Sequence, residues 1–200
     1  MSADVALRVD AEAIAACDPG DERVRRLYRL IDQDSLLRGN FTLSSGRKSN
    51  YLFQLRQTTL DPEGAALIGD LIVEFMRLQH VRCIGGLELG AVPVVTAVAT
   101  MSFQRTYPIS AFFVRKQAKA HGARERIDGQ IPDSGEVLVV DDVTTTGQSI
   151  LDAVKHISNR KLSISKALSI VDREEGAAEK LASHGITLFS LFKRSQFDIG

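Results

Sequence analysis

The chain has 200 residues, of which 44% are hydrophobic and 25% charged, and its 25 basic side chains balance 25 acidic ones to a formal net charge of zero. This length suits one domain with a complete core, with room for a small accessory lobe but not for a second domain of normal size. A neutral chain has no bulk attraction for nucleic acid or anionic membranes, so any anion site must be local.

Cysteine content and the chain start point to a reducing compartment. The two cysteines, Cys17 and Cys83, are too few and too far apart for a disulfide framework or a zinc site. The first ten residues lack a basic start followed by a long apolar core, and no apolar run approaches the length of a membrane span. We therefore expect a cytoplasmic protein that contacts neither membrane nor nucleic acid.

The N-terminal part predicts two helices and a hairpin. Residues 10–17 and 21–34 have helical patterns separated by an Asp-Pro-Gly turn. From residue 41 the chain reads Phe-Thr-Leu-Ser-Ser-Gly-Arg-Lys-Ser-Asn-Tyr-Leu-Phe, in which two short apolar or aromatic arms flank a Ser-Ser-Gly turn. Arg47 and Lys48 would then lie near the tip of a β-hairpin, where charged residues are ordinarily solvated.

Strand and helix patterns alternate from residue 62 onward. Asp61 followed by Pro62 predicts a helix start, and the apolar residues after it recur at helical spacing. A short strand at 81–84, ended by Gly85 and Gly86, leads through Leu-Glu-Leu-Gly-Ala-Val-Pro into another helix. Such a turn can bind phosphate, although tight strand-to-helix turns also need glycine for steric reasons alone.

A strongly basic segment follows the strand predicted at 109–114. Residues 115–126 read Arg-Lys-Gln-Ala-Lys-Ala-His-Gly-Ala-Arg-Glu-Arg, so five cations against one acid give a local charge of +5 − 1 = +4 with histidine neutral. Almost nothing apolar anchors this segment to a core. It is either a solvated, mobile loop or a lid that closes over a reaction site.

The most informative stretch runs from residue 137 to residue 150 and reads Val-Leu-Val-Val-Asp-Asp-Val-Thr-Thr-Thr-Gly-Gln-Ser-Ile. Its first four residues predict a buried parallel strand, and Asp141 and Asp142 appear where that strand should end. The hydroxyl-rich turn precedes a helical pattern, so its N–H groups and the helix dipole can bind a phosphate. The adjacent acids can accept hydrogen bonds from sugar hydroxyls or lie near a divalent cation. Receiver domains and nucleoside triphosphatases also place acids after an apolar strand, and the Thr-Thr-Thr-Gly turn that follows here makes this alternative much less favoured.

The C-terminal part completes the alternating pattern. A strand at 164–171 ends in Asp-Arg-Glu-Glu-Gly, a helix covers 174–183 with Gly185 as its C-terminal cap, and a last strand covers 186–192. Alternating strands and helices predict an α/β fold with a doubly wound, mainly parallel sheet, whose ligands bind at the carboxyl ends of the strands.

These segments together resemble the orotate phosphoribosyltransferases. The stretch at 137–150 is similar to the phosphoribosyl pyrophosphate signature of type I phosphoribosyltransferases. The hairpin, the basic segment Arg-Lys-x-x-Lys-x-His-Gly and the Asp-Arg pair resemble the orotate branch. The resemblance implies the type I phosphoribosyltransferase fold as one domain, with a small N-terminal hood at about 1–60 and an α/β core at about 61–200.

The resemblance also implies an activity and its accessories. The expected reaction transfers ribose 5-phosphate from phosphoribosyl pyrophosphate to a ring nitrogen of orotate, giving orotidine 5′-monophosphate and pyrophosphate in pyrimidine (UMP) biosynthesis. Mg²⁺ is expected through the pyrophosphate and ribose hydroxyls, without a protein ligand set. A homodimer is expected, with the basic loop shared between subunits.

Residue roles follow from the same resemblance. The catalytic residues would be Arg115, Lys119, His121, Asp141 and Asp142. Phosphoribosyl pyrophosphate would be bound by Arg115, Lys116, Lys119, His121, Asp141, Asp142, Val143, Thr144, Thr145, Thr146, Gly147, Gln148 and Ser149. Orotate would be bound by Thr145 and Arg173. The chain departs from many relatives at Ser44 and Gly90, where they carry phosphate-binding lysines.

Two other functions fit the same fold. One is a phosphoribosyltransferase for another base, such as a purine. The other is a non-catalytic regulator that senses nucleotides or binds RNA, which should have lost the catalytic loop or gained a basic face. Length excludes a fused decarboxylase within this chain, but not a separate partner enzyme.

Overall fold

The structure is a computed structural model that describes residues 18, 20–42, 46, 48–117 and 126–199. Its strands are β1 (Leu36–Thr42), β2 (Lys48–Phe53), β3 (Cys83–Leu87), β4 (Ser110–Val114), β5 (Ile127–Gly129), β6 (Ser134–Thr144), β7 (Lys161–Asp172) and β8 (Thr187–Lys193). Its helices are α1 (Glu22–Leu30), continued by a π-helical turn η2 (Ile31–Ser35), then α2 (Arg56–Thr59), α3 (Pro62–Leu78), α4 (Ala91–Gln104), α5 (Gln148–Ile157), α6 (Ala177–Ala182) and the 3-10 turn η3 (Arg194–Gln196). The helix expected at 10–17 lies outside the described residues.

The central sheet has six strands in the order β5-β4-β3-β6-β7-β8. All neighbours are parallel except β5, which runs antiparallel to β4 at the edge. From β3 the chain continues to β4 on one side of the sheet centre, whereas from β6 it continues to β7 on the other side. The direction in which strands are added therefore reverses between β3 and β6. In such sheets the carboxyl ends of the two strands at the reversal form the ligand-binding crevice. The predicted doubly wound sheet is confirmed, and the three-residue strand β5 is an addition.

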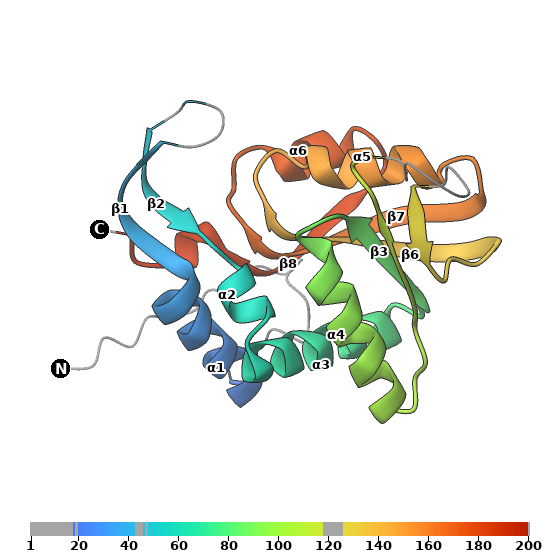
Figure 1. The fold of residues 1–200 in the computed structure, drawn as a ribbon, viewed down its shortest axis with the longest axis horizontal. Helices are drawn as coiled ribbons and strands as arrows, with labels where there is room; N and C mark the ends of the chain where they lie inside the picture. The colour runs from blue at the N-terminus through green and yellow to red at the C-terminus, as the bar shows by residue number, and fades with distance from the viewer. Residues whose placement is uncertain (1–17, 19, 43–45, 47, 118–125, 200) are drawn as a thin grey trace.

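Helices cover both faces of this sheet. Helices α3 and α4 lie on one side and α5 and α6 on the other (Figure 1). Two buried apolar clusters correspond to these two interfaces, one that includes α1, α3 and α4 and one that includes α5 and α6. The central strand β6 explains the continuous apolar run in the sequence, because Val137, Leu138, Val139 and Val140 are at most 1% exposed. None of the helices in the described part of the chain is both long and apolar enough to span a membrane.

The helix signals read from the sequence correspond to real caps. Asp61 accepts a 2.8 Å hydrogen bond from the Gly64 N–H, and Pro62 occupies the first turn of α3, where its missing N–H costs nothing. Gly185 ends the segment after α6 with a φ of +74°, and the Ile186 N–H reaches back to the Leu181 carbonyl at 3.0 Å. These local signals therefore position α3 and the end of α6 correctly.

Gly85 and Gly86 do not end strand β3, as the sequence pattern suggested, but lie inside it. A Cβ atom on Gly85 would lie 2.1 Å from Cζ of Phe112, and one on Gly86 would lie 2.2 Å from the Val140 carbonyl oxygen. These residues are therefore glycine because neighbouring strands leave no room for a side chain. The glycines bring β3 close to β4 and β6 at the place where the sheet order reverses.

The N-terminal hairpin forms a second, two-stranded sheet from β1 and β2. Its antiparallel pairing confirms the predicted hairpin, but β1 begins at Leu36, five residues before the expected arm. A register shift between Arg38 and Phe41 interrupts the pairing, so no simple alternation marks the start of this strand. The hairpin lies beside the end of the chain, with η3 next to it (Figure 1).

Candidate functional site at the carboxyl edge of the sheet

The acid pair lies at the sheet reversal, within strand β6 rather than after it. Pairing with β7 continues through Val143 and Thr144, which keeps Asp141 and Asp142 in extended backbone. The Asp142 N–H donates to Asp141 Oδ1 at 3.1 Å, and the Val143 N–H donates to Asp142 Oδ1 at 2.9 Å. Both carboxylates are therefore held by the backbone at the crevice that the fold creates.

Burial, together with the negative charge of Asp142 beside it, raises the pKa of the Asp141 carboxyl group to about 8. A hydrogen bond from Ser149 acts in the opposite direction. When a buried carboxyl group beside a second one ionises, neither solvent nor a positive charge stabilises its negative charge. The pair is thus suited to a ligand that brings hydroxyl donors or positive charge.

The turn after β3 closes directly onto these acids. A Cβ atom on Gly90 would lie 2.3 Å from Asp142 Oδ1 and 3.2 Å from Asp141 Oδ1. Any side chain at position 90 would require Asp142 to move. The structure therefore explains why this chain has glycine at the position where the family resemblance leads us to expect lysine. The turn and the acid pair pack together with no room for a side chain between them.

The turn from Thr144 to Ser149 leads into α5, as the sequence predicted. Gly147 has a φ of +75°, a left-handed conformation that suits glycine, and its carbonyl accepts the helical hydrogen bond from the Leu151 N–H at 3.1 Å. Thr144 is 2% exposed, and its hydroxyl has no hydrogen-bond partner among the described residues. The first N–H groups of this ten-residue helix and the more accessible hydroxyls of Thr145, Thr146 and Ser149 could together bind an anion.

Gln148, by contrast, has its side chain engaged elsewhere. Its amide nitrogen donates to Asp152 Oδ1 at 2.8 Å, and its amide oxygen accepts from Lys180 Nζ at 2.7 Å. In this arrangement Asp152 and Lys180 hold the side-chain amide of Gln148, and its backbone N–H lies in the first turn of α5. The predicted role of Gln148 in phosphate binding would therefore depend on its backbone N–H at the start of α5.

Arg173 is joined to the phosphate turn through the backbone. Its N–H donates to the Thr144 carbonyl at 2.9 Å, which continues the pairing of Thr144 with Asp172. The helix expected from residue 174 begins only at Ala177, because Glu174 and Gly176 have φ values of +58° and +89° and form a loop. This loop turns the Arg173 side chain toward the hairpin.

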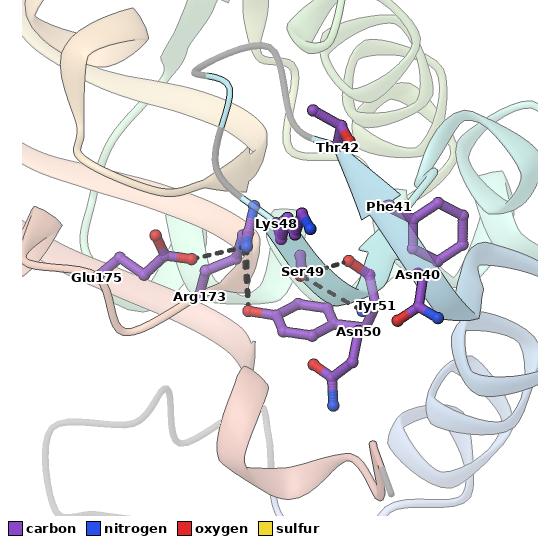
Figure 2. A pocket seen from close by; sticks show the side chains of 9 residues that line it. All are labelled: Asn40, Phe41, Thr42, Lys48, Ser49, Asn50, Tyr51, Arg173 and Glu175. Carbon is purple, nitrogen blue, oxygen red and sulfur yellow. Dashed lines mark hydrogen bonds and ion pairs between the residues drawn. The ribbon is translucent and has the colours of Figure 1, made fainter.

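A pocket of about 700 Å³ lies between this loop and the hairpin. It is lined by Asn40, Phe41, Thr42, Lys48, Ser49, Asn50, Tyr51, Arg173 and Glu175 (Figure 2). Arg173 Nε and Nη2 donate to the Tyr51 hydroxyl oxygen at 3.3 and 3.1 Å, and Nη2 forms an ion pair with Glu175 Oε1 at 2.7 Å. The Arg173 side chain is only 10% exposed, and its Cζ lies 4.9 Å from the centre of the Tyr51 ring. A guanidinium held in a pocket is well suited to a planar carboxylate.

Sequence reasoning missed Tyr51 and Glu175 as neighbours of Arg173. They come from β2 and from the loop before α6, and the Tyr51 contact joins residues 122 positions apart in the chain. The available signals were the tyrosine in the hairpin pattern and the second glutamate after Arg173, but neither shows which side chain it would meet.

The basic segment begins and ends beside the β3–α4 turn. Arg115 pairs with Asp128 on β5, and the Lys116 N–H donates to Glu88 Oε1 at 2.7 Å. The Arg115 N–H donates to the Arg126 carbonyl at 2.7 Å, so the two ends of the segment meet. Lys119 and His121 lie outside the described residues. The structure therefore attaches the loop at the carboxyl end of β4, on the same edge of the sheet as the acid pair.

Comparisons with known proteins agree with this site. The model of the phosphoribosyl transferase domain family matches residues 57–189. An orotate phosphoribosyltransferase of Rhodopseudomonas palustris (strain TIE-1) is 47% identical over 178 residues, covering 86% of this chain and 94% of the relative. One of Aquifex aeolicus is 42% identical over 174 residues, covering 86% and 95%.

Solved structures give the same result. The orotate phosphoribosyltransferase of Mycobacterium tuberculosis H37Rv, in complex with 5-phospho-α-D-ribosyl 1-diphosphate, is 35% identical with a TM-score of 0.72, covering 87% of this chain and 98% of that one. Matches of this extent cover both the hairpin and the α/β core. The chain belongs to the orotate phosphoribosyltransferase family.

Proposed function

We propose that this chain transfers the ribose 5-phosphate of phosphoribosyl pyrophosphate to orotate, giving orotidine 5′-monophosphate and pyrophosphate in pyrimidine biosynthesis. The observation that carries the proposal is the backbone link between Thr144 and Arg173. This bond joins the turn before α5, where a phosphate could bind, to a pocket whose guanidinium is only 10% exposed. A sugar phosphate and an anionic base can therefore be bound side by side.

The sugar would be held by the turn and the acid pair. The N–H groups and hydroxyls from Thr144 to Ser149 would bind the 5-phosphate, while Asp141 and Asp142 would accept hydrogen bonds from the ribose hydroxyls. Thr145 and Arg173 would bind orotate, with the guanidinium paired to its carboxylate. This division leaves the pyrophosphate facing the β3–α4 turn and the basic loop.

The leaving group would be stabilised by cations of that loop. The bond to pyrophosphate breaks early in this chemistry, so negative charge grows on the leaving group while the sugar becomes positive. Arg115, Lys116, Lys119 and His121 would lower the barrier if they pair with that growing charge more strongly than with the ground state. Closure of the loop would also exclude water, which would otherwise hydrolyse the activated sugar.

Magnesium is part of the proposal, and the residues fit it. Carboxylate oxygens are hard ligands, and Mg²⁺ is typically bound by one or two carboxylates together with substrate phosphates. The described residues contain no cluster of three or more histidine, cysteine or acidic side chains that could hold a metal. Asp141 and Asp142 would thus act beside Mg²⁺ bound to the pyrophosphate, and the positive charge of the metal would partly offset the negative charge of the leaving group.

Lys119→Ala is expected to lower kcat by roughly 100-fold or more, since one desolvated cation contributes several kcal/mol to such a transition state. The fold should remain intact, and circular dichroism would check this. Lys161→Ala is a suitable control, because Lys161 is exposed at the opposite, amino-terminal end of β7. Near-normal turnover of the Lys119 variant would remove this lysine from the catalytic role.

A homodimer is also proposed, and an apolar groove supports it. The groove has a volume of about 720 Å³ and lies between α3 and α4, with Pro62, Ala66, Pro93 and Ala97 in its walls. Leu60 and Leu89 line it while 69% and 57% exposed. Leu89 belongs to the turn that packs on the acid pair, so a second copy seated on this groove would adjoin the site.

Leu89→Glu is expected to shift the chain toward monomers and to make activity depend on protein concentration, because a charge would be buried at the interface. Sedimentation velocity and assays over a dilution series would measure both effects. Leu78→Glu is the matched control, since Leu78 is 52% exposed but lies outside the groove. A wild-type chain that is monomeric and fully active when dilute would refute the dimer.

The function itself is tested by magnesium-dependent consumption of orotate with phosphoribosyl pyrophosphate, run beside uracil, adenine, hypoxanthine and guanine. Turnover confined to orotate is the expected result. Turnover of another base would keep the sugar site and reject the base assignment. Binding of phosphoribosyl pyrophosphate without any turnover would favour the regulator.

A further inference from the structure

The hydrogen-bonding capacity of Arg173 is already partly used inside the protein. Nη2 has two oxygen partners, the Tyr51 hydroxyl at 3.1 Å and Glu175 Oε1 at 2.7 Å, and Nε donates to the same hydroxyl at 3.3 Å. Nη1 makes no hydrogen bond with any described residue. Figure 2 shows Tyr51 and Glu175 reaching the guanidinium from different directions.

A guanidinium pairs with a carboxylate through one of two edges, either Nε with Nη2 or Nη1 with Nη2. Both edges include Nη2. If both oxygens of a substrate carboxylate pair with Arg173, one of them must bind Nη2. That oxygen must therefore displace the Tyr51 hydroxyl or the Glu175 carboxylate from Nη2. The Tyr51 hydroxyl is neutral and bonds to two nitrogens, whereas Glu175 is the same chemical group as the incoming ligand.

We propose that Glu175 is an exchangeable counterion that occupies Arg173 in the empty site and is displaced by the carboxylate of the base. This inference rests on the proposed function, in which Arg173 binds the orotate carboxylate. In the empty pocket the pair neutralises a guanidinium that is only 10% exposed. When the carboxylate arrives, Arg173 exchanges one carboxylate for another and its charge stays compensated.

The exchange makes Glu175 a residue that tunes the affinity of this pocket for an anionic base. A base without a carboxylate, such as uracil, brings nothing that can replace Glu175 and leaves the ion pair intact. An anionic base gains the guanidinium but must first break the internal pair. The pair therefore lowers the affinity for every anionic ligand of this pocket, and only a ligand with further contacts in the pocket overcomes it.

The test compares two neighbouring glutamates. Glu175→Gln weakens the internal pair without changing side-chain size, so KM for orotate should fall by roughly five-fold, with KM for phosphoribosyl pyrophosphate unchanged. Glu174→Gln removes the same charge one residue away. In the wild-type protein the Glu174 carboxylate accepts hydrogen bonds from the Ser195 N–H at 2.7 Å and the Ser195 hydroxyl at 3.1 Å, and not from Arg173. KM for orotate should therefore stay near the wild-type value in this variant.

An unchanged or higher KM for orotate in Glu175→Gln would overturn the exchange, as would an equal decrease in both variants. A structure of the wild-type protein with orotate gives a second readout, in which Arg173 and Glu175 should be more than 4 Å apart, the limit for an ion pair. An intact pair there would also refute the inference. If the wild-type protein does not use orotate at all, the proposed function fails instead.

Discussion

Asp141→Asn is expected to stabilise the folded protein while abolishing most of its transferase activity. The pKa of Asp141 is raised by burial and by Asp142, which means that the folded state disfavours the ionised carboxylate. Asparagine keeps the size and the acceptor oxygen without the charge. The free energy of unfolding should therefore increase by about 2 kcal/mol at pH 8 to 9. In the same pH range, where the wild-type carboxyl group is ionised, the loss of a charged acceptor for the ribose should lower kcat/KM by roughly 100-fold or more.

The pH dependence of this effect has a definite sign. The unfolded carboxyl group ionises near its ordinary pKa of 3.8 and the folded one near 8, so the folded state binds this proton more tightly. The ionised group therefore destabilises the fold progressively as the pH rises from about 4 to about 8, and constantly above that. The stability difference between variant and wild type should thus vanish near pH 4 and be largest above pH 8.

Thermal unfolding of the substrate-free proteins at pH 5, 7 and 9 would measure this difference. Asp133→Asn is the control, because the Asp133 side chain is fully exposed and should show no such trend. A variant that is less stable than wild type at pH 9 would mean that the acid pair stabilises the fold. The same variant with near-normal activity would show that Asp141 does not hold the sugar.

Arg173→Ala is expected to raise KM for orotate by on the order of 100-fold, with KM for phosphoribosyl pyrophosphate within about three-fold of wild type. The reason is that, in the proposed arrangement, the sugar phosphate contacts the turn and the acid pair, whereas only the base enters the pocket of Arg173. Arg173→Lys should recover only part of the loss, since an ammonium group cannot offer a planar fork.

Steady-state kinetics with each substrate varied in turn would separate these effects. Arg194→Ala is the matched control, because Arg194 also lies over the Tyr51 ring, at 5.5 Å, but does not line the pocket. Unchanged dependence on orotate concentration in the Arg173 variant would exclude the carboxylate contact. An equal rise in KM for both substrates would instead indicate a general disturbance of the loop between β7 and α6.

The proposed exchange at Glu175 adds a constraint on how these variants combine. Arg173 and Glu175 act on the same carboxylate, so their effects should not be additive. In the Arg173→Ala background, Glu175→Gln has no ion pair to weaken, and its effect on KM for orotate should disappear. A double-mutant cycle would therefore separate the exchange from a simple change in the charge of the pocket.

Local sequence patterns determined much of the architecture. The apolar run at 137–140, the capped start of α3 and the turn that precedes α5 are all encoded within a few neighbouring residues. Each depends on burial, backbone conformation or the unsatisfied groups of a helix end, which short patterns express well. The acid pair and the phosphate turn could be located for the same reason, since all their residues are contiguous.

Contacts between distant segments were decided only by the tertiary structure. Gly85 and Gly86 look like a strand end, but Phe112 and Val140 leave no room for their side chains, and this crowding exists only once the strands are paired. Likewise, Arg173 meets Tyr51 because the hairpin folds against the loop after β7. Periodicity shows which face of an element is buried but not which element packs against it. The sequence therefore located the acid pair and the turn before α5, whereas only the fold assembled the pocket around Arg173.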